Sequence, residues 1–131
     1  MIVVDASAVL AILLEEPEAK DCFRILRDSA GSKMSAVNFW EVLVRARAVG
    51  SEPGALAAEQ LLIDAELEIV PADREAAREA ARAFARYGRR TSAGLNLGDC
   101  FAYALAKREG APLLYKGDDF SRTDIRNALS A

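Results

Sequence analysis

Short apolar strands separated by helical segments are the feature that most restricts how this chain can fold. The run Ile2–Val4 is fully apolar and β-branched, which is typical of a strand buried on both faces. Further strands are expected at Lys33–Ser35, Leu67–Val70 and Pro112–Tyr115, with helical patterns between them. Strands that alternate with helices indicate βαβ units, in which helices cover both faces of a parallel sheet. The predicted fold class is therefore α/β, with three layers in the order α/β/α.

Helices in the first half of the chain are indicated by the spacing of apolar residues and by proline. One helix is expected directly after Asp5. Pro17 suits the first position of the next helix, which is expected to turn Phe23 toward the core. A third helix over Ala36–Val49 has an apolar stripe that ends in Val49.

The second half of the chain is punctuated by glycine and proline. The stretch Gly50–Gly54 predicts a break before a helix over Ala55–Ala65. A long helix opens after Pro71–Asp73, and the helix that carries Asp99 ends at Gly110. The tail residues Thr123–Ile125 are expected to add a short edge strand. The apolar face of the long helix consists of Ala77, Ala80, Ala81 and Phe84.

Length and composition narrow the functional classes. The chain has 131 residues, so we expect a single domain over residues 1–131 with a sizeable core. The net charge of -3 provides no overall basic field for nucleic acid, although a local basic patch is compatible with it. The chain has no histidine, which excludes imidazole-based acid–base catalysis and imidazole-bound zinc. An enzyme of this composition has to rely on carboxylates and a bound metal ion.

The expected location is the cytoplasm, without a membrane span. The segment Met1–Asp5 has no basic region and its apolar run is short, so it does not resemble a signal peptide. Nowhere does the sequence approach the run of about 18 apolar residues that a membrane helix requires. Two cysteines, Cys22 and Cys100, are too few for a disulfide framework, and both are expected to be buried thiols.

Acidic residues recur where strands end and helices begin. Asp5 follows the first strand, Glu41 lies within an apolar helix, and Asp99 lies at the start of another. The pair Asp118-Asp119 follows the last strand. An α/β fold gathers its ligand groups at the carboxyl ends of its strands, so these acids are expected to converge. Converging carboxylates repel one another unless a cation lies between them, and Mg²⁺ or Mn²⁺ is the usual partner of such oxygen ligands.

Four segments resemble the acidic motifs of the PIN-domain nucleases, with the closest likeness to the VapC toxins of bacterial type II toxin–antitoxin modules. They are Ile2–Ala8, Ser35–Glu41, Leu97–Cys100 and Leu114–Phe120, and together they span essentially the whole chain. The resemblance implies a PIN-like α/β/α fold and hydrolysis of RNA with Mg²⁺ or Mn²⁺. It also implies a homodimer and a cognate antitoxin, similar to VapB, whose C-terminal segment lies across the active-site groove.

The same resemblance implies roles for the acids. Asp5 and Asp99 become the principal metal ligands, and Glu41 a ligand or a water-positioning acid. The fourth acid is Asp118 or Asp119, and the motif does not decide between them.

Two polar residues near these acids are expected to support the site. Ser7 supports the first metal ligand or contacts a phosphate, and Asn38 lies behind the ligands. Many relatives carry Thr or Ser at the position of Asn38, so here the chain departs from the family pattern.

Structural roles compete with these functional ones. Asp5 is equally suited to capping the helix that follows it. Glu41 and Arg45 have the spacing of an ion pair on an exposed helix face. One residue of Asp118-Asp119 is explained by turn chemistry alone.

Two aromatic residues and the basic residues also have alternative readings. Phe39 and Trp40 are expected to pack in the core or across a dimer interface. Arg89 and Arg90 lack nearby acids and are the candidates for contact with RNA phosphates. Arg78, Arg82 and Arg86 instead form a solvated helix face, on which Glu75 and Glu79 are available as partners.

Two other functions fit parts of the sequence. One is a PIN-like module that binds RNA or protein without cleaving it. The other is a receiver-like phosphoacceptor domain, which also uses acids at strand ends and a late lysine such as Lys116. A receiver needs a central aspartate after a middle strand, and Leu67–Pro71 supplies none. Filled acidic positions in every motif favour the nuclease over the inactive module.

Overall fold

A parallel sheet of four strands forms the centre of the molecule. The computed structural model describes residues 1–130. Its strands are β1 (Val3–Val4), β2 (Lys33–Ser35), β3 (Glu68–Val70) and β4 (Leu113–Leu114), arranged in the order β3-β2-β1-β4. Val3 pairs in parallel with Lys33 on one side and with Leu113 on the other. The predicted buried strand at Ile2–Val4 is therefore confirmed as β1, which, like β2, has a neighbouring strand on each edge.

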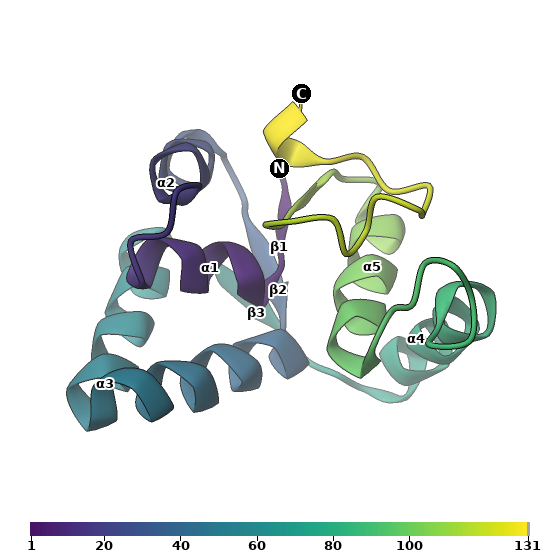
Figure 1. Ribbon diagram of the computed structural model, residues 1–131, viewed down its shortest axis with the longest axis horizontal. Coiled ribbons are helices and arrows are strands. Elements are labelled where there is room, and N and C mark those ends of the chain that lie inside the picture. Colours follow the sequence, from purple (N-terminus) through teal and green to yellow (C-terminus); the bar gives the residue numbers. More distant parts are fainter. Residues whose placement is uncertain (131) are drawn as a thin grey trace.

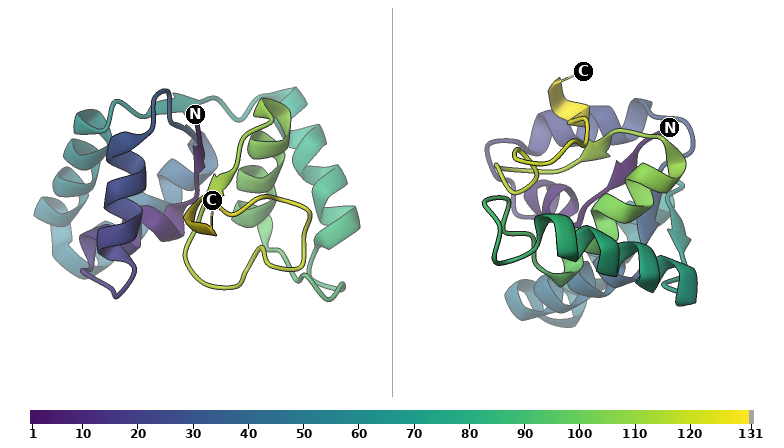
Figure 2. Two further views of the ribbon diagram at one scale, coloured as in Figure 1. Left: turned by 90° about the horizontal axis from the view of Figure 1, so that it is seen from above. Right: turned by 90° about the vertical axis from the view of Figure 1, so that its right-hand side faces the viewer.

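Helices cover both faces of this sheet, as predicted. On one side lie α1 (Ala6–Leu13), α2 (Ala19–Asp28) and α3 (Ala36–Asp64), and on the other α4 (Arg74–Tyr87) and α5 (Leu97–Glu109), as Figure 1 shows. Figure 2 shows the two helical layers from above. Alternate residues of β1 serve the two layers, because Val4 belongs to the core under α1–α3 and Val3 to the core under α5.

Helix starts agree with the capping residues in the sequence. The side chains of Asp5, Ser35 and Asp73 each accept a hydrogen bond from a backbone N–H in the first turn of the following helix. At α5 the N-cap is Asn96, and Asp99 is the third residue of the helix, in a reciprocal capping box with Asn96. The helix ends at Gly110 in the left-handed conformation, as expected.

The break predicted in the middle of the chain is a kink. Helix α3 runs through Gly50–Gly54 with a single residue out of helical geometry, Ser51, at φ 57° and ψ -156°. The predicted helices over Ala36–Val49 and Ala55–Ala65 are thus the two arms of α3. Close approach of the arms requires a glycine, since a Cβ at Gly54 would lie 3.5 Å from the backbone carbon of Ala46 and closer still to its oxygen.

Several apolar residues that we expected in the core lie at the surface. Phe23 and Val49 are exposed, although Cys22 and Leu26 of the same α2 face are buried. On α4 the residues that pack inward are Ala80 and Ala83, so the predicted face with Phe84 is rotated and partly faces solvent. The cause is the neighbouring α5, because Ala80 and Ala83 belong to the same core cluster as its buried residues.

The chain termini and loops show smaller differences. Pro17 precedes α2, whose N-cap is Glu18, so Pro17 is not its first residue. The predicted tail strand Thr123–Ile125 is wrong: the tail pairs with β4 only through an isolated bridge from Asn127 to Leu113, followed by a 3-10 turn. Both cysteines are free and buried, as predicted. None of the helices within residues 1–130 combines the length and apolarity that a membrane crossing needs.

Candidate active site

The starts of α1, α3 and α5 converge at the carboxyl end of the sheet (Figure 1), and a cavity of about 300 Å³ opens there. This position follows from the topology, because parallel strands deliver their following loops to one edge. The cavity is strongly polar. Its lining consists of Asp5, Ala6, Ser7, Leu10, Glu16, Trp40, Glu41, Val44, Arg45, Asn96, Asp99, Lys116 and Asp119.

Asp5 is the most deeply placed of the acids, at 5% exposure. Its Oδ2 accepts hydrogen bonds from the Ser7 backbone N–H at 3.1 Å and from the Ser7 hydroxyl at 2.6 Å. Ser7 Oγ in turn accepts from the backbone N–H of Lys116 at 3.0 Å. Capping and lining the cavity are therefore not alternatives for Asp5, because one oxygen caps α1. Ser7 contacts this acid as expected, and it also links the ends of β1 and β4.

Asp99 is held by the first turn of its own helix. Its Oδ2 accepts from the Asn96 N–H at 3.0 Å, and its own N–H donates to Asn96 Oδ1 at 2.8 Å. One carboxylate oxygen is thus engaged in the capping box. The side chain is only partly buried and lines the cavity together with Asp5. Carboxylates from opposite ends of the chain therefore face the same cavity.

Glu41 reaches the cavity from α3, and its partner is not the predicted one. Its Oε1 accepts a hydrogen bond from Asn38 Nδ2 at 2.7 Å, and the same Nδ2 donates to the Gly98 carbonyl at 3.0 Å. Asn38 is fully buried, and its Oδ1 has no hydrogen-bond partner in residues 1–130. Arg45 lines the cavity but forms no ion pair with Glu41 in the described chain. Asn38 thus lies directly behind an acid of the cavity, as expected.

The turn after β4 contributes one acid of its pair. Asp119 lines the cavity, whereas Asp118 does not and its carbonyl closes a turn with Ser121. A fifth acid that the sequence did not suggest is Glu16, which is paired with Lys116 at the cavity wall. Glu16 comes from the loop after α1, where nothing in the local pattern marks it as part of a site.

The electrostatics of these acids differ from those of ordinary surface carboxylates. Burial raises the pKa of Asp5 to about 6, and repulsion from Glu41 and Asp119 adds to it. Burial likewise raises the pKa of Asp99 to about 6, with repulsion from Asp5 and Asp119, while the Asn96 N–H opposes the shift. The pKa of Glu41 is also raised, chiefly by burial. Burial is the main cause for all three acids, so each carboxylate is easier to protonate than a surface acid, and a cation bound beside them would favour their ionised forms.

The donor set fits a hard divalent cation. Five residues that line the cavity carry carboxylate oxygens, the ligands that Mg²⁺ and Mn²⁺ prefer. Within residues 1–130 no three acidic or cysteine side chains already form a closed group that could hold a metal ion. Mg²⁺ commonly binds through one or two carboxylates and retains several waters, so an open arrangement suits it.

Other predicted contacts lie at or beyond the rim. Phe39 packs against the core, as expected. Trp40 is 63% exposed and lines the cavity, so it does not pack in the core, and its packing across a dimer interface stays a prediction. Arg89 and Arg90 are exposed on the loop after α4 and do not line the cavity. Arg89 is nevertheless close enough for its charge to lower the pKa of Asp99.

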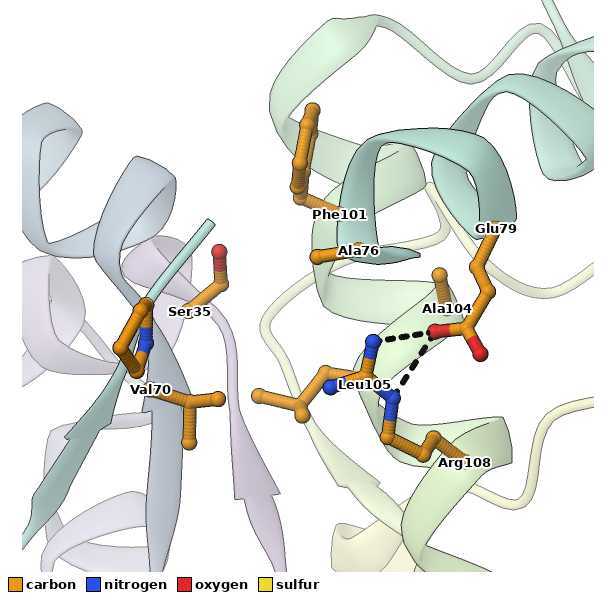
Figure 3. Close-up of a pocket in the computed structure, with 9 residues that line it drawn as sticks. Ser35, Val70, Ala76, Glu79, Phe101, Ala104, Leu105 and Arg108 are labelled. Atoms are coloured by element: carbon orange, nitrogen blue, oxygen red, sulfur yellow. Dashed lines mark hydrogen bonds and ion pairs between the residues drawn. The ribbon is translucent and has the colours of Figure 1, made fainter. Parts of the chain in front are cut away.

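A second hollow, between β3 and the helices α4 and α5, is structural. Figure 3 shows Glu79 and Arg108 paired across its wall, with 2.6 Å between Arg108 Nη2 and Glu79 Oε1. Its volume of about 10 Å³ leaves room for no more than a single water molecule. This pair also corrects the predicted use of Glu79, which pairs with Arg108 of α5 instead of an arginine of its own helix.

Comparison with known proteins gives one consistent result. The PIN domain family model matches residues 2–126. The chain is 40% identical over 124 residues to Ribonuclease VapC of Mycolicibacterium smegmatis, covering 94% of this chain and 96% of that protein. Its fold resembles VapC20 of Mycobacterium tuberculosis, described as a sarcin-ricin loop cleaving toxin. That match has a TM-score of 0.79 at 15% identity and covers 95% of this chain and 96% of the other.

A second solved structure is a toxin–antitoxin complex from Klebsiella pneumoniae. Its TM-score is 0.71 at 18% identity, with coverage of 95% of this chain and 93% of the other. At such identities these two structures support the fold alone. The family model and the identity to the mycobacterial relative extend over nearly the whole sequence, and they confirm the resemblance found in the acidic motifs. The chain belongs to the PIN-domain family, among the VapC proteins.

Proposed function

We propose that this protein is a metal-dependent endoribonuclease and the toxin of a type II toxin–antitoxin pair. The observation that carries the proposal is the convergence of four acids on one cavity, where burial raises the pKa of three of them. The four are Asp5, Glu41, Asp99 and Asp119, and the pKa is raised at all but Asp119. Cleavage of RNA is the activity named for the mycobacterial relatives. A cluster of acids without histidine suits phosphodiester hydrolysis, because metal ions supply the necessary positive charge.

Asp5 and Asp99 are the residues we assign to the metal. When bound, Mg²⁺ or Mn²⁺ supplies Lewis-acid stabilisation of phosphate charge and lowers the pKa of water. Ser7 and Asn96 fix one oxygen of Asp5 and Asp99 respectively, so the remaining oxygen of each carboxylate is free to bind.

The other two acids, Glu41 and Asp119, have different proposed roles. Glu41, oriented by Asn38, is a ligand or the acid that orients the attacking water. Asp119 completes the negative cluster from the turn after β4.

An antitoxin partner is supported by the toxin–antitoxin complex among the structural neighbours. The open cavity and its apolar rim suit a protein segment that enters with a positive charge. Trp40 and Val44 form that rim, and both are exposed. Such a segment would neutralise the carboxylates and block RNA at the same time.

We also propose a homodimer, formed through the outward face of α4 and α5. Ala77, Ala81, Phe84 and Leu97 border an apolar hollow of about 420 Å³ there. Phe84 is 47% and Leu97 66% exposed, which is unusual for large apolar side chains so close together. A second copy of the chain packed on this face would bury these exposed apolar side chains of α4.

Sedimentation should show a dimer for the wild type and a monomer for Phe84→Arg. The matched control is Ile63→Arg, whose exposed side chain lies elsewhere, on α3.

The nuclease proposal is tested with purified protein, single-stranded RNA and DNA of the same sequence, and added Mg²⁺, Mn²⁺ or a chelator. We expect cleavage of RNA with either metal and none with the chelator. Cleavage unaffected by chelation would contradict the metal role, and equal cleavage of DNA would contradict the assignment as a ribonuclease. Binding of RNA without cleavage under any condition would favour the inactive module.

The cytoplasmic location of the protein stays a prediction.

A further inference from the structure

The first turn of α5 contains a glycine for which the backbone gives no reason. Gly98 is the second residue of this helix. The glycines with positive φ are Gly31, Gly94, Gly110 and Gly117, and Gly98 is not one of them. Glycine in a helix is less favourable than alanine. The surroundings of Gly98, in contrast, give a reason for the missing side chain.

That feature is the carboxylate of Glu41. A Cβ built on Gly98 would lie 2.6 Å from Glu41 Cδ and 2.5 Å from Oε2, with Oε1 closer still. These distances are far shorter than van der Waals contact. The carboxylate thus rests directly on the Cα of Gly98, and it occupies the space where any other residue would carry its side chain.

Asn38 fixes this arrangement from behind. Its Nδ2 donates to Glu41 Oε1 at 2.7 Å and to the Gly98 carbonyl at 3.0 Å, so a single amide ties the acid of α3 to the backbone of α5. Asn38 is fully buried, which restricts its motion. The carboxylate is therefore held between two elements that are distant in sequence and adjacent in space.

We infer that Gly98 is a positioning residue whose lack of a side chain seats the Glu41 carboxylate against α5, beside Asp99. The inference rests on the proposed function, in which Glu41 acts on RNA. Neither the family description nor the names of the relatives assign a role to this glycine. It acts only through Glu41 and does not itself contact substrate.

A substitution at Gly98 should displace the acid and leave the fold intact. The atoms that an added Cβ meets are the end of a flexible side chain, which can rotate toward the open cavity. Rotation breaks the hydrogen bond from Asn38 and leaves that buried amide with one partner fewer. We therefore expect Gly98→Ala to fold and to hold Glu41 in the wrong place.

The first test is a thermal-unfolding cycle, which does not depend on any catalytic activity. Gly98→Ala should lower Tm by about 3–5 °C in the wild-type background, through the lost hydrogen bond. In the Glu41→Ala background the same substitution should raise Tm, because the space is vacant and alanine favours the helix. Gly50→Ala is the matched control: a Cβ there meets nothing within 4 Å, so its effect should be the same in both backgrounds.

The second test is RNA cleavage by the same set of variants. Gly98→Ala should lower kcat about 10- to 100-fold, as loss of a supporting contact typically does, with little change in KM for RNA. In the Glu41→Ala background it should cause no further loss. A purely structural role would predict equal losses in both backgrounds.

The two tests separate the inference from the proposed function. Equal changes of Tm in both backgrounds would overturn the seating of Glu41 by Gly98. The predicted inversion of Tm, combined with undiminished cleavage by Glu41→Ala, would support the seating and overturn the catalytic role of Glu41. Equal losses of kcat in both backgrounds would show that Gly98 acts on Asp99 or on α5 itself, and would overturn the inference.

Discussion

Two sites in this molecule use aspartates in opposite ways. In the cavity at the end of the sheet, Asp5 and Asp99 lie among other acids, and burial with mutual repulsion raises the pKa of each to about 6. On the far side of α5, Asp124 accepts a hydrogen bond from the Tyr103 hydroxyl at 2.5 Å and from Lys107 Nζ at 3.1 Å. These donors lower its pKa.

The comparison separates structural acids from functional ones by their surroundings. Asp124 ties the C-terminal segment to α5, and its charge is balanced within the protein. Asp5 and Asp99 in the cavity have no such ion-pair partner within residues 1–130, and the pKa of each is raised by burial. Carboxylates with raised pKa values that gather in one cavity are typical of a functional site, because burial and like charges are combined there to shift pKa values.

The largest expected effect is on catalysis. Asp99→Asn should lower RNA cleavage by at least about 100-fold, since loss of a metal ligand exceeds the 10- to 100-fold cost of losing an outer partner. Asp124→Asn, an identical chemical change at the balanced site, should leave the rate within about two-fold. Initial rates with labelled RNA at saturating Mg²⁺ measure both. If both variants lost a similar share of the cleavage rate, the distinction between the acids of the cavity and Asp124 would be contradicted.

The next effect concerns pH and metal. Because the pKa values of Asp5 and Asp99 rise from 3.8 to about 6 on folding, the native state binds more protons than the unfolded state between these values. The contribution of these two groups to the free energy of unfolding therefore falls as pH rises through this window and stays low above it. Mg²⁺ should restore stability at pH 7.

This effect is measured as the increase of Tm on adding Mg²⁺, at pH 7.5 and at pH 5. We expect the increase to be smaller at pH 5, because protons compete with the metal for both carboxylates. Asp99→Asn is the control and should show little increase at either pH. A Mg²⁺-induced increase of the same size in wild type and variant would mean that the ion binds elsewhere.

A smaller effect distinguishes the two sites by stability alone. At pH 7, without metal, Asp124→Asn should lower the free energy of unfolding by about 1 kcal/mol, the difference between a charged and a neutral acceptor for the Tyr103 hydroxyl. Asp99→Asn should raise the free energy of unfolding, because a repulsive charge is removed and the amide oxygen can still accept the hydrogen bond from the Asn96 N–H. Urea titrations of both variants measure these changes. If both substitutions changed the free energy of unfolding in the same direction, the distinction between a balanced Asp124 and a repulsive Asp99 would be contradicted.

Most of the fold and most of the acids could be predicted from the sequence. β1 and β4 are short and fully apolar, and the capping residues are well marked, so the order of elements followed from the sequence. The side of α4 that packs inward could not be predicted, because its alanines form several similar apolar stripes. Only the contact with α5 determines which of these stripes is buried. Glu16 and the seat at Gly98 were missed for a related reason: each depends on a contact between segments remote in sequence.

The smallest effect extends the comparison from acids to arginines. Arg82 Nη2 of α4 lies 3.7 Å from Glu75 Oε1, whereas Arg89 and Arg90 have no ion-pair partner among residues 1–130 and are exposed on the loop after α4. If they contact RNA phosphates, Arg89→Ala and Arg90→Ala should each raise KM a few-fold without changing kcat. Each lost contact should also reduce the slope of log affinity against log salt by about 0.7. Arg82→Ala, the paired control, should leave both quantities unchanged. A slope that is the same in all three variants would place the RNA elsewhere, because an arginine that does not displace counterions is not a phosphate contact.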